Sequence, residues 1–120
     1  MAGISQTRAN AMLDTELSGT LNLRLYTVAP TATTNGTEVS GSAYAAQTIA
    51  FSASSAGVKT QSGAVNFPAA TSNYSATVVA WGITDATTQV KFFLVLGSPI
   101  TVLTGDQITF PASTISVTLA

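Results

Sequence analysis

The side chains able to perform chemistry in this chain are few: five carboxylates and two lysines, with no histidine and no cysteine. Histidine is the most common general base and metal ligand, and cysteine supplies the thiolates of many metal sites. A nucleophilic serine or threonine would depend on Lys59 or Lys91 as its base, and neither lysine lies in a recognisable catalytic motif. The composition therefore predicts that the chain is not an enzyme and that it binds no cofactor.

The carboxylates do not form a pattern that favours catalysis or metal binding. Asp14 and Glu16 lie two positions apart in a helical segment, where side chains at that spacing point in different directions. Asp85 and Asp106 lie in predicted turns, where aspartate commonly accepts hydrogen bonds from the backbone. A calcium site would need several oxygen ligands that converge. We therefore predict a solvated helix face, two turn-stabilising aspartates and no metal site.

Trp81, Phe92 and Phe93 could form an aromatic platform for a carbohydrate. They lie in strongly apolar segments, however, where aromatic side chains more often belong to the core, and we predict core positions. The three tyrosines fall on the polar side of a predicted strand or near loops. Tyrosine joins a large contact area to a polar tip, so two interpretations stay open for them: contact with a neighbouring subunit, or packing of local loops.

Charge is the most unusual feature of the composition. Charged residues make up 8% of the chain, with a formal net charge of −1, against about 25% charged residues in an ordinary globular domain. The basic residues are too few to neutralise a run of phosphates, so we expect no binding to nucleic acid. A weakly charged surface instead favours association between protein molecules. No apolar run reaches the roughly 18 residues of a membrane span, and the N-terminal segment does not resemble a signal peptide, so synthesis in the cytoplasm is expected.

One helix is predicted, over residues 5–18. Its apolar residues recur at the spacing of a single helical face, Ser5 can cap its start, and Gly19 can end it. The apolar residues of that face are Ala9, Met12, Leu13 and Leu17. A helix of this length is marginal in isolation, so we expect it to pack either against its own β domain or against a neighbouring subunit.

From residue 20 onward the apolar positions recur with a period of two, which is typical of half-buried strands. In the first strand, Leu21, Leu23 and Leu25 share one face. Residues 30–42 form a long loop. Residues 90–96 are almost entirely apolar, which predicts a strand buried on both faces. Further strands are predicted at 47–53, 58–61, 64–67, 75–84, 100–103, 107–110 and 115–119.

Short strands separated by frequent turn signals are typical of a sandwich or a barrel. The length of 120 residues fits one domain. We therefore predict an all-β fold, a single jelly-roll-like β-sandwich of about eight strands with a short N-terminal helix. Residues 1–19 would form the N-terminal helical segment, and residues 20–120 the β-sandwich domain.

Several segments resemble, by their order and spacing, a family of small structural proteins of tailed-bacteriophage virions that are often described as tail-fibre or minor tail proteins. The most specific segment runs from Gly36 to Ala45 (GTEVSGSAYA) and leads to Ile49-Ala50-Phe51. The other matching segments are the helix at 9–13, the strand at 23–27 followed by Pro30, Val65–Thr71, Trp81–Ala86, Thr104–Phe110 and the closing strand at 115–119. The resemblance covers essentially the whole chain.

The resemblance implies a β-sandwich module of the virion that clusters with copies of itself, as a homotrimer. Two placements fit. A capsid decoration (cement) protein would bind the major capsid protein and stabilise its lattice at the capsid surface. A minor tail or tail-fibre-type protein would contact other virion proteins at the tail, or take part in host attachment. We favour decoration, because the chain has no coiled-coil shaft and its low charge suits burial between subunits.

Contacts between subunits are expected at the N-terminal helix and the 30–42 loop. The candidate interface residues are Met12, Leu13, Leu17, Tyr26, Val39, Tyr44 and Tyr74.

Overall fold

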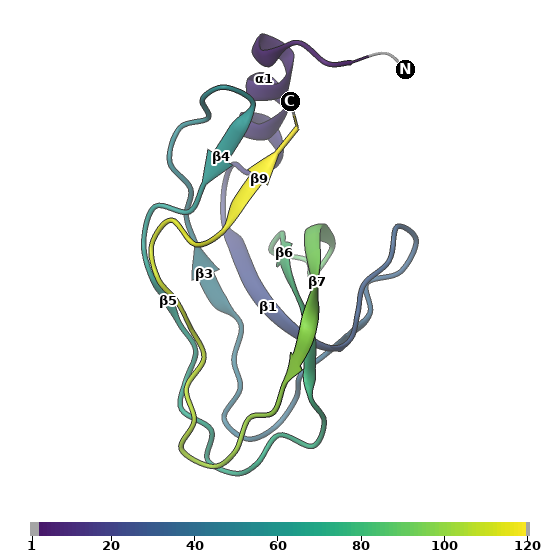
Figure 1. Ribbon diagram of the computed structural model, residues 1–120, viewed down its shortest axis with the longest axis vertical. Helices are drawn as coiled ribbons and strands as arrows, with labels where there is room; N and C mark the ends of the chain where they lie inside the picture. Colours follow the sequence, from purple (N-terminus) through teal and green to yellow (C-terminus); the bar gives the residue numbers. More distant parts are fainter. Residues whose placement is uncertain (1–2, 120) are drawn as a thin grey trace.

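The computed structural model describes residues 3–119, which form one short helix and a mostly β structure (Figure 1). The helix α1 spans Gln6–Glu16. The strands that follow are β1 (Leu21–Val28), β2 (Thr37–Glu38), β3 (Gln47–Ile49), β4 (Val58–Thr60), β5 (Val65–Asn66), β6 (Val78–Thr84), β7 (Val90–Ile100), β8 (Thr109–Phe110) and β9 (Ser116–Thr118). The predicted class, all-β with a short N-terminal helix, is therefore confirmed.

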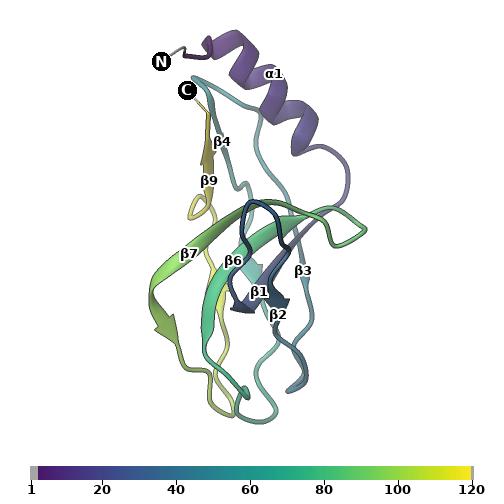
Figure 2. The same cartoon turned by 90° about the vertical axis from the view of Figure 1, so that its right-hand side faces the viewer.

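The largest sheet is antiparallel and has five strands, in the order β2-β1-β6-β7, with β3 paired to β1 beside β2. Figure 2 shows β1, β6 and β7 side by side in this sheet. Leu21, Leu23 and Leu25 of β1 are buried on its inner face, as their spacing predicts. Trp81 of β6 lies opposite Leu25 on one side and opposite Leu94 of β7 on the other. The inner face of the sheet is thus apolar from β1 as far as β7.

Two segments cover part of this inner face, residues 57–70 and residues 105–119. They run antiparallel and pair as two short ribbons, β4 with β9 and β5 with β8. The buried Gln61 joins the ribbons, since its Nε2 donates to the carbonyl oxygens of Gly63 (2.6 Å) and Phe110 (3.0 Å), and its Oε1 accepts from the Ile115 N–H (3.2 Å). The core lies between the sheet and these ribbons. This pairing does not confirm the finer prediction of a jelly-roll, because the sheets are not closed.

Helix α1 packs against its own β domain, which is the first of the two alternatives that the sequence left open. Ser5 caps it by accepting the Arg8 N–H (3.3 Å), and Ala9 and Leu13 are fully buried. On the side facing β4, Asn10 Oδ1 accepts the Gly57 N–H (2.9 Å), and Asp14 pairs with Lys59 (2.6 Å). No helix in residues 3–119 is long and apolar enough to cross a membrane.

The pair between Asp14 and Lys59 makes part of the stability depend on pH. The hydrogen bond from the Lys59 ammonium, followed by that from Ser54, lowers the pKa of Asp14 below its usual 3.8. A carboxylate with a depressed folded-state pKa stabilises the fold fully above its unfolded pKa, and the effect is lost as pH falls through the folded pKa. We therefore expect Asp14→Asn to lower the urea midpoint at pH 7, and expect the gap from the unmodified protein to shrink below about pH 4. A gap that is the same at pH 7 and pH 3 would contradict this role.

The predicted 30–42 loop contains strand β2 and folds back against the end of β1. Gly36 lies at the point of closest approach and has a φ of +70°. A Cβ atom there would lie 2.3 Å from the carbonyl oxygen of Val28, which is backbone and has little freedom to move. The glycine therefore allows the loop to lie on β1.

We expect Gly36→Ala to lower the free energy of unfolding by about 2 kcal/mol, since it combines an unfavourable positive φ with a backbone clash. Gly41→Ala is the matched control, because Gly41 has a φ of +76° with nothing within 4 Å of its added Cβ. That control should cost only about 1 kcal/mol. Urea unfolding of both variants measures the difference, and equal losses would show that the close approach to Val28 is unimportant.

Strand β7 differs most from its prediction. Residues 90–96 were expected to be buried on both faces, but this prediction is wrong: Phe93, Leu94 and Val95 are 40%, 51% and 54% exposed. The reason is position, because among residues 3–119 strand β7 ends the strand order of the sheet and pairs with β6 alone. The strand also continues through Ser98 and Pro99 to Ile100, with a register shift against β6.

Candidate assembly surface

The carboxylates considered for chemistry have structural partners. Asp85 Oδ1 accepts hydrogen bonds from the Thr87 N–H (2.8 Å), the Thr87 hydroxyl (2.7 Å) and the Gln89 N–H (3.1 Å). These bonds, that of the Thr87 side chain first, lower the pKa of Asp85. Asp106 Oδ2 accepts the Leu103 N–H (3.0 Å). Both aspartates thus stabilise turns, as predicted. Among residues 3–119 no group of three or more metal-binding side chains comes together.

A cluster of polar side chains ties the 36–45 segment to β1. Arg24 Nη1 donates to both carboxylate oxygens of Glu38 (3.0 Å each), and its Nε donates to the Thr84 hydroxyl (2.8 Å). The Tyr44 hydroxyl donates to Glu38 Oε2 (2.6 Å) and accepts the Leu25 N–H (3.0 Å). Burial, together with the bond to Glu38, raises the pKa of Tyr44 far above its ordinary value. This tyrosine therefore stays a neutral donor and anchors the segment.

A series of aromatic rings leads from this cluster to the surface. Tyr44 stacks on the fully buried Phe67 with ring centroids 5.8 Å apart. Phe67 meets Phe110 edge to face at 6.1 Å, and Phe110 meets Trp81 edge to face at 6.4 Å. Trp81 packs against the core, as predicted, but it is only partly buried. The series connects the anchored loop to the inner face of β6 and β7.

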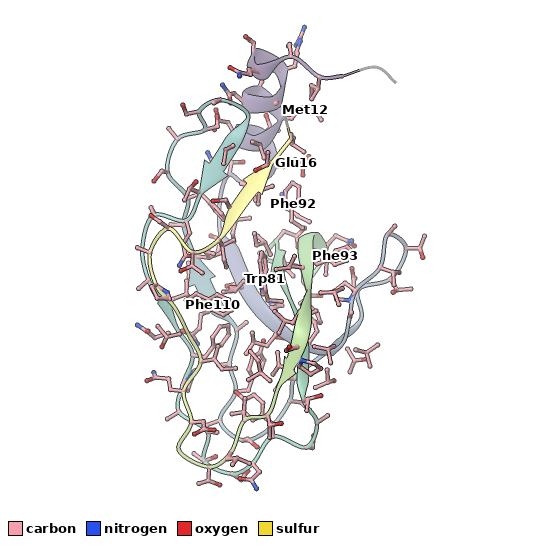
Figure 3. The ribbon with its side chains drawn as sticks, in the orientation of Figure 1. Met12, Glu16, Trp81, Phe92, Phe93 and Phe110 are labelled. Atoms are coloured by element: carbon pink, nitrogen blue, oxygen red, sulfur yellow. The ribbon has the colours of Figure 1, made fainter. Side chains whose placement is uncertain are left out.

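The inner face of β7 borders a groove of about 380 Å³ that separates it from β9. Trp81, Phe92 and Leu94 form its wall on the side of the sheet, and Ile115 and Val117 contribute to the opposite wall. Figure 3 shows Trp81 and Phe92 between β9 and β7. The ribbon of β4 and β9 therefore does not extend over the whole inner face, and the part next to β7 is left open.

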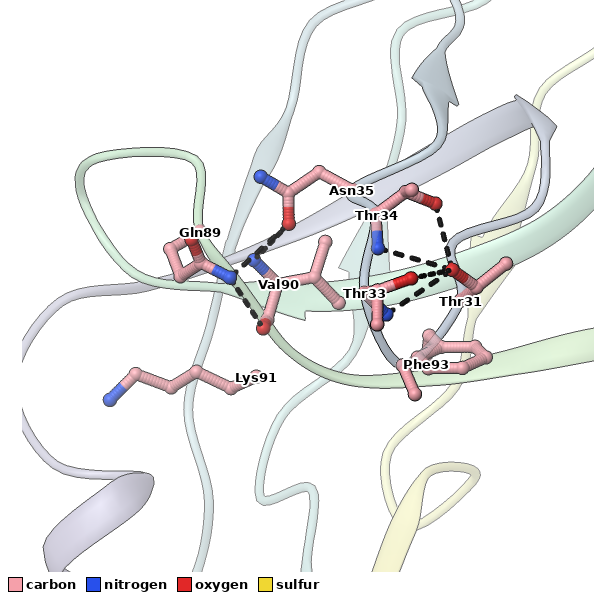
Figure 4. A pocket seen from close by; sticks show the side chains of 9 residues that line it. Thr31, Thr33, Thr34, Asn35, Gln89, Val90, Lys91 and Phe93 are labelled. Atoms are coloured by element: carbon pink, nitrogen blue, oxygen red, sulfur yellow. Dashed lines mark hydrogen bonds between the residues drawn. The ribbon is translucent and has the colours of Figure 1, made fainter.

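A second hollow, of about 260 Å³, lies between the 31–35 loop and the start of β7 (Figure 4). Its polar groups bond to one another. Asn35 Oδ1 accepts from Gln89 Nε2 and the Val90 N–H (3.3 Å each), and Thr31 Oγ1 accepts the Thr34 N–H (3.1 Å). Lys91 also lines it, but its ammonium donates to the Glu16 carbonyl oxygen (2.6 Å). These contacts hold the loop beside β7.

The chain has thus a compact core, an open apolar groove, and carboxylates in structural roles. Residues 3–118 match the model of a family described as podophage GP4 fiber I protein gp80. The chain belongs to this family. The match spans nearly all the described structure and confirms the resemblance to virion structural proteins of tailed phages. No match was found among curated proteins.

The groove and the exposed strand β7 can be compared with the interface residues predicted from the sequence. The predicted interface residues lie mostly elsewhere. Leu13, Leu17, Tyr26 and Val39 are at most 5% exposed within the chain itself. The side chains of Leu13, Leu17 and Val39 belong to the hydrophobic core of the chain. The side chain of Tyr26 lies against Gly82.

The other three candidates differ in exposure. Tyr44 and Tyr74 are partly buried against the core. Tyr44 anchors a loop, so for this tyrosine the structure agrees with the packing of local loops, the second of the two interpretations considered. Met12 is 50% exposed on the outer side of α1. Of the seven candidates it offers the largest fraction of its surface to a neighbour, and the interface role of all seven stays a prediction.

The exposed segment of β7 was missed as a candidate surface, because an uninterrupted apolar run is typical of a central strand. Pro99 is a signal that could have identified it. Proline has no N–H to donate, so within sheets it is confined largely to edge strands and bulges. Here it lies within β7, at the free edge and beside the register shift.

Proposed function

We propose that this chain is a structural component of the tail-fibre apparatus of its phage, and that it works by packing against copies of itself and other virion proteins rather than by catalysis. The observation that carries the proposal is the fiber I family match over residues 3–118. It covers the helix, the sheet and both ribbons, so the family relationship belongs to the whole folded unit.

The character of the surface supports a role in assembly. The chain has nine charged residues in 120 and a net charge of −1, so electrostatic repulsion between copies is weak. Four large apolar side chains of β7 are at least 40% exposed, namely Phe93, Leu94, Val95 and Ile100. A concentration of exposed apolar residues on one part of a soluble protein favours a protein–protein contact.

The family match supports the tail-fibre alternative better than the capsid decoration role favoured from the sequence. The preference for decoration depended on the absence of a coiled-coil shaft and on the low charge, which suits burial between subunits at either place. A fibre built from several short chains does not require a shaft within each of them, so that absence does not distinguish the two placements. The proposed partners are two further copies of the chain, in a homotrimer, and neighbouring virion proteins. The major capsid protein would be a partner only in the less favoured role, capsid decoration.

The placement is tested by immunogold electron microscopy of purified phage particles, with antibodies raised against this chain. The proposal predicts gold at the tail and its fibres. Gold spread over the head surface would overturn it in favour of decoration. Complete absence of the chain from purified particles, checked by mass spectrometry, would overturn any virion role.

A further inference from the structure

Strand β7 is a sheet edge, and the 31–35 loop protects only its start, where the Val90 N–H donates to Asn35 Oδ1 (3.3 Å). The strand pairs with β6 alone among residues 3–119, so its other side presents backbone N–H and C=O groups without a strand partner. Soluble proteins usually protect such an edge with charges, a bulge or a covering segment. Residues 92–96 (FFLVL) carry no charge, and the nearby Lys91 is turned toward Glu16. Pro99 and the register shift protect only the far end of the strand.

Strand β9, across the groove, also has an edge without a strand partner among the described residues. Its neighbours in sequence, Ile115 and Leu119, direct their backbone hydrogen bonds toward Gln61 and Gly57, on the side of β4. Hydrogen-bonding direction alternates along an antiparallel strand. The backbone groups of Ser116 and Thr118 therefore point away from β4. The apolar groove is thus bordered by two strand edges, that of β7 and that of β9.

We propose that strand β7 of a second copy of this chain closes this groove, so that the β7 edge and the β7–β9 groove form the contact between copies. This rests on the proposed function and specifies the surface through which the chain associates with itself. The contact buries Leu94 and covers the exposed part of Trp81.

The chemistry of the groove favours another β7 as its occupant. The groove accepts an extended, uncharged segment with large apolar side chains, and residues 92–96 of β7 have this character. Because these five residues carry no charge, pairing them with the same five residues of a second copy places no like charges opposite each other. The net charge of −1 adds little repulsion between the whole chains.

The exposed surface area and the length of the molecule are also compatible with a contact between copies. A compact monomer of 12.2 kDa exposes about 6,100 Å², and this chain exposes 6424 Å². Its radius of gyration is 15.0 Å, against about 13.6 Å for a compact domain of this length. A standard interface covers about 800 Å² on each partner, roughly an eighth of this surface. An eleven-residue strand extends up to about 35 Å, which is much of the 46 Å length of the molecule.

The test is a pair of matched variants. Leu94→Asp places a charge in the proposed contact, and Leu103→Asp makes the same change at an equally exposed leucine (51% and 50%) outside β7 and β9. Light scattering over a dilution series should show unmodified protein and Leu103→Asp as assemblies of two or more copies. Leu94→Asp should weaken association at least about thirtyfold, toward the 12.2 kDa monomer. Circular dichroism and the urea midpoint check that both variants fold.

A monomeric unmodified protein, an assembled Leu94→Asp variant, or equal dissociation of both variants would overturn the proposal. Because an aspartate can itself disturb a sheet, a second test uses cysteine labelling. The chain has no cysteine, so Leu94→Cys and Leu103→Cys each introduce a single thiol. In the assembled protein, a maleimide should label the Leu103→Cys variant at least tenfold faster than the Leu94→Cys variant. Equal labelling would overturn the β7 contact while leaving the immunogold result, and thus the proposed function, unaffected.

Discussion

Phe67→Ala should destabilise this protein more than any other single substitution considered, by about 4 kcal/mol. Phe67 is 0% exposed and lies between Tyr44 and Phe110 in the aromatic series. Its removal loses the burial of a whole ring and leaves a cavity between the sheet and the ribbons. The ring also connects the loop anchored by Tyr44 to the wall of the groove, so the loss should reach the proposed assembly surface.

Urea unfolding at one fixed protein concentration measures this loss, since association would otherwise shift the midpoint with concentration. Leu103→Ala is the control, because Leu103 is 50% exposed and its truncation should change stability by no more than about 0.5 kcal/mol. A loss below 1 kcal/mol for Phe67→Ala would mean that the core between the sheet and the ribbons is not packed as described.

Glu38→Ala should cost about 3 kcal/mol, the second largest effect. The substitution removes the carboxylate that accepts from both Arg24 and Tyr44. The Arg24 side chain is only 14% exposed, so its guanidinium would be left largely buried without its ion-pair partner. Removing one partner of a buried pair typically costs 3–5 kcal/mol. We take the lower end of that range because the Glu38 side chain is 30% exposed.

Glu16→Ala provides the matched control for Glu38→Ala. The Glu16 side chain is 56% exposed and lies 3.7 Å from the Lys91 ammonium, so its loss should cost less than about 1 kcal/mol. A double-mutant cycle between Glu38→Ala and Tyr44→Phe should in addition give a coupling energy of about 1 kcal/mol, since the two side chains share a hydrogen bond. Equal losses for the two glutamates would contradict the structural role of the Arg24–Glu38–Tyr44 cluster.

The elements that the sequence predicts well are those with a local signal. The helix was found because Ala9 and Leu13 share a face and Ser5 is a good cap. The inner face of β1 was found because its leucines alternate. The turn roles of Asp85 and Asp106 were found because aspartate bonds to nearby backbone groups in turns. Each of these depends on residues close together in the chain.

The features that could not be predicted depend on strand order. An apolar run such as residues 92–96 is buried on both faces in a central strand and exposed at an edge. Strand β7 takes the edge position because no other strand in the described part of the chain pairs beyond it. Likewise, Glu38 meets Arg24 only because β2 pairs with β1. The groove was not foreseeable for the same reason, since its walls come from Trp81, residues 92–94 and residues 114–118.

The family was accessible from the sequence because it depends on the order and spacing of many short segments, each of them common by itself. The placement on the virion could not be predicted from the sequence, because no single residue distinguishes a tail position from a capsid position. The segment from Gly36 to Ala45 illustrates the difference. It carried the resemblance, yet the structure gives Gly36, Glu38 and Tyr44 roles in holding a loop against β1.

An electron cryomicroscopy map of the intact phage particle tests the central claim most directly. The account predicts density for this fold in the tail-fibre apparatus, with the β7 edge and the groove beside β9 covered by strand β7 of a neighbouring copy. The fold on the head lattice, or at the tail with β7 bare toward solvent, would contradict it.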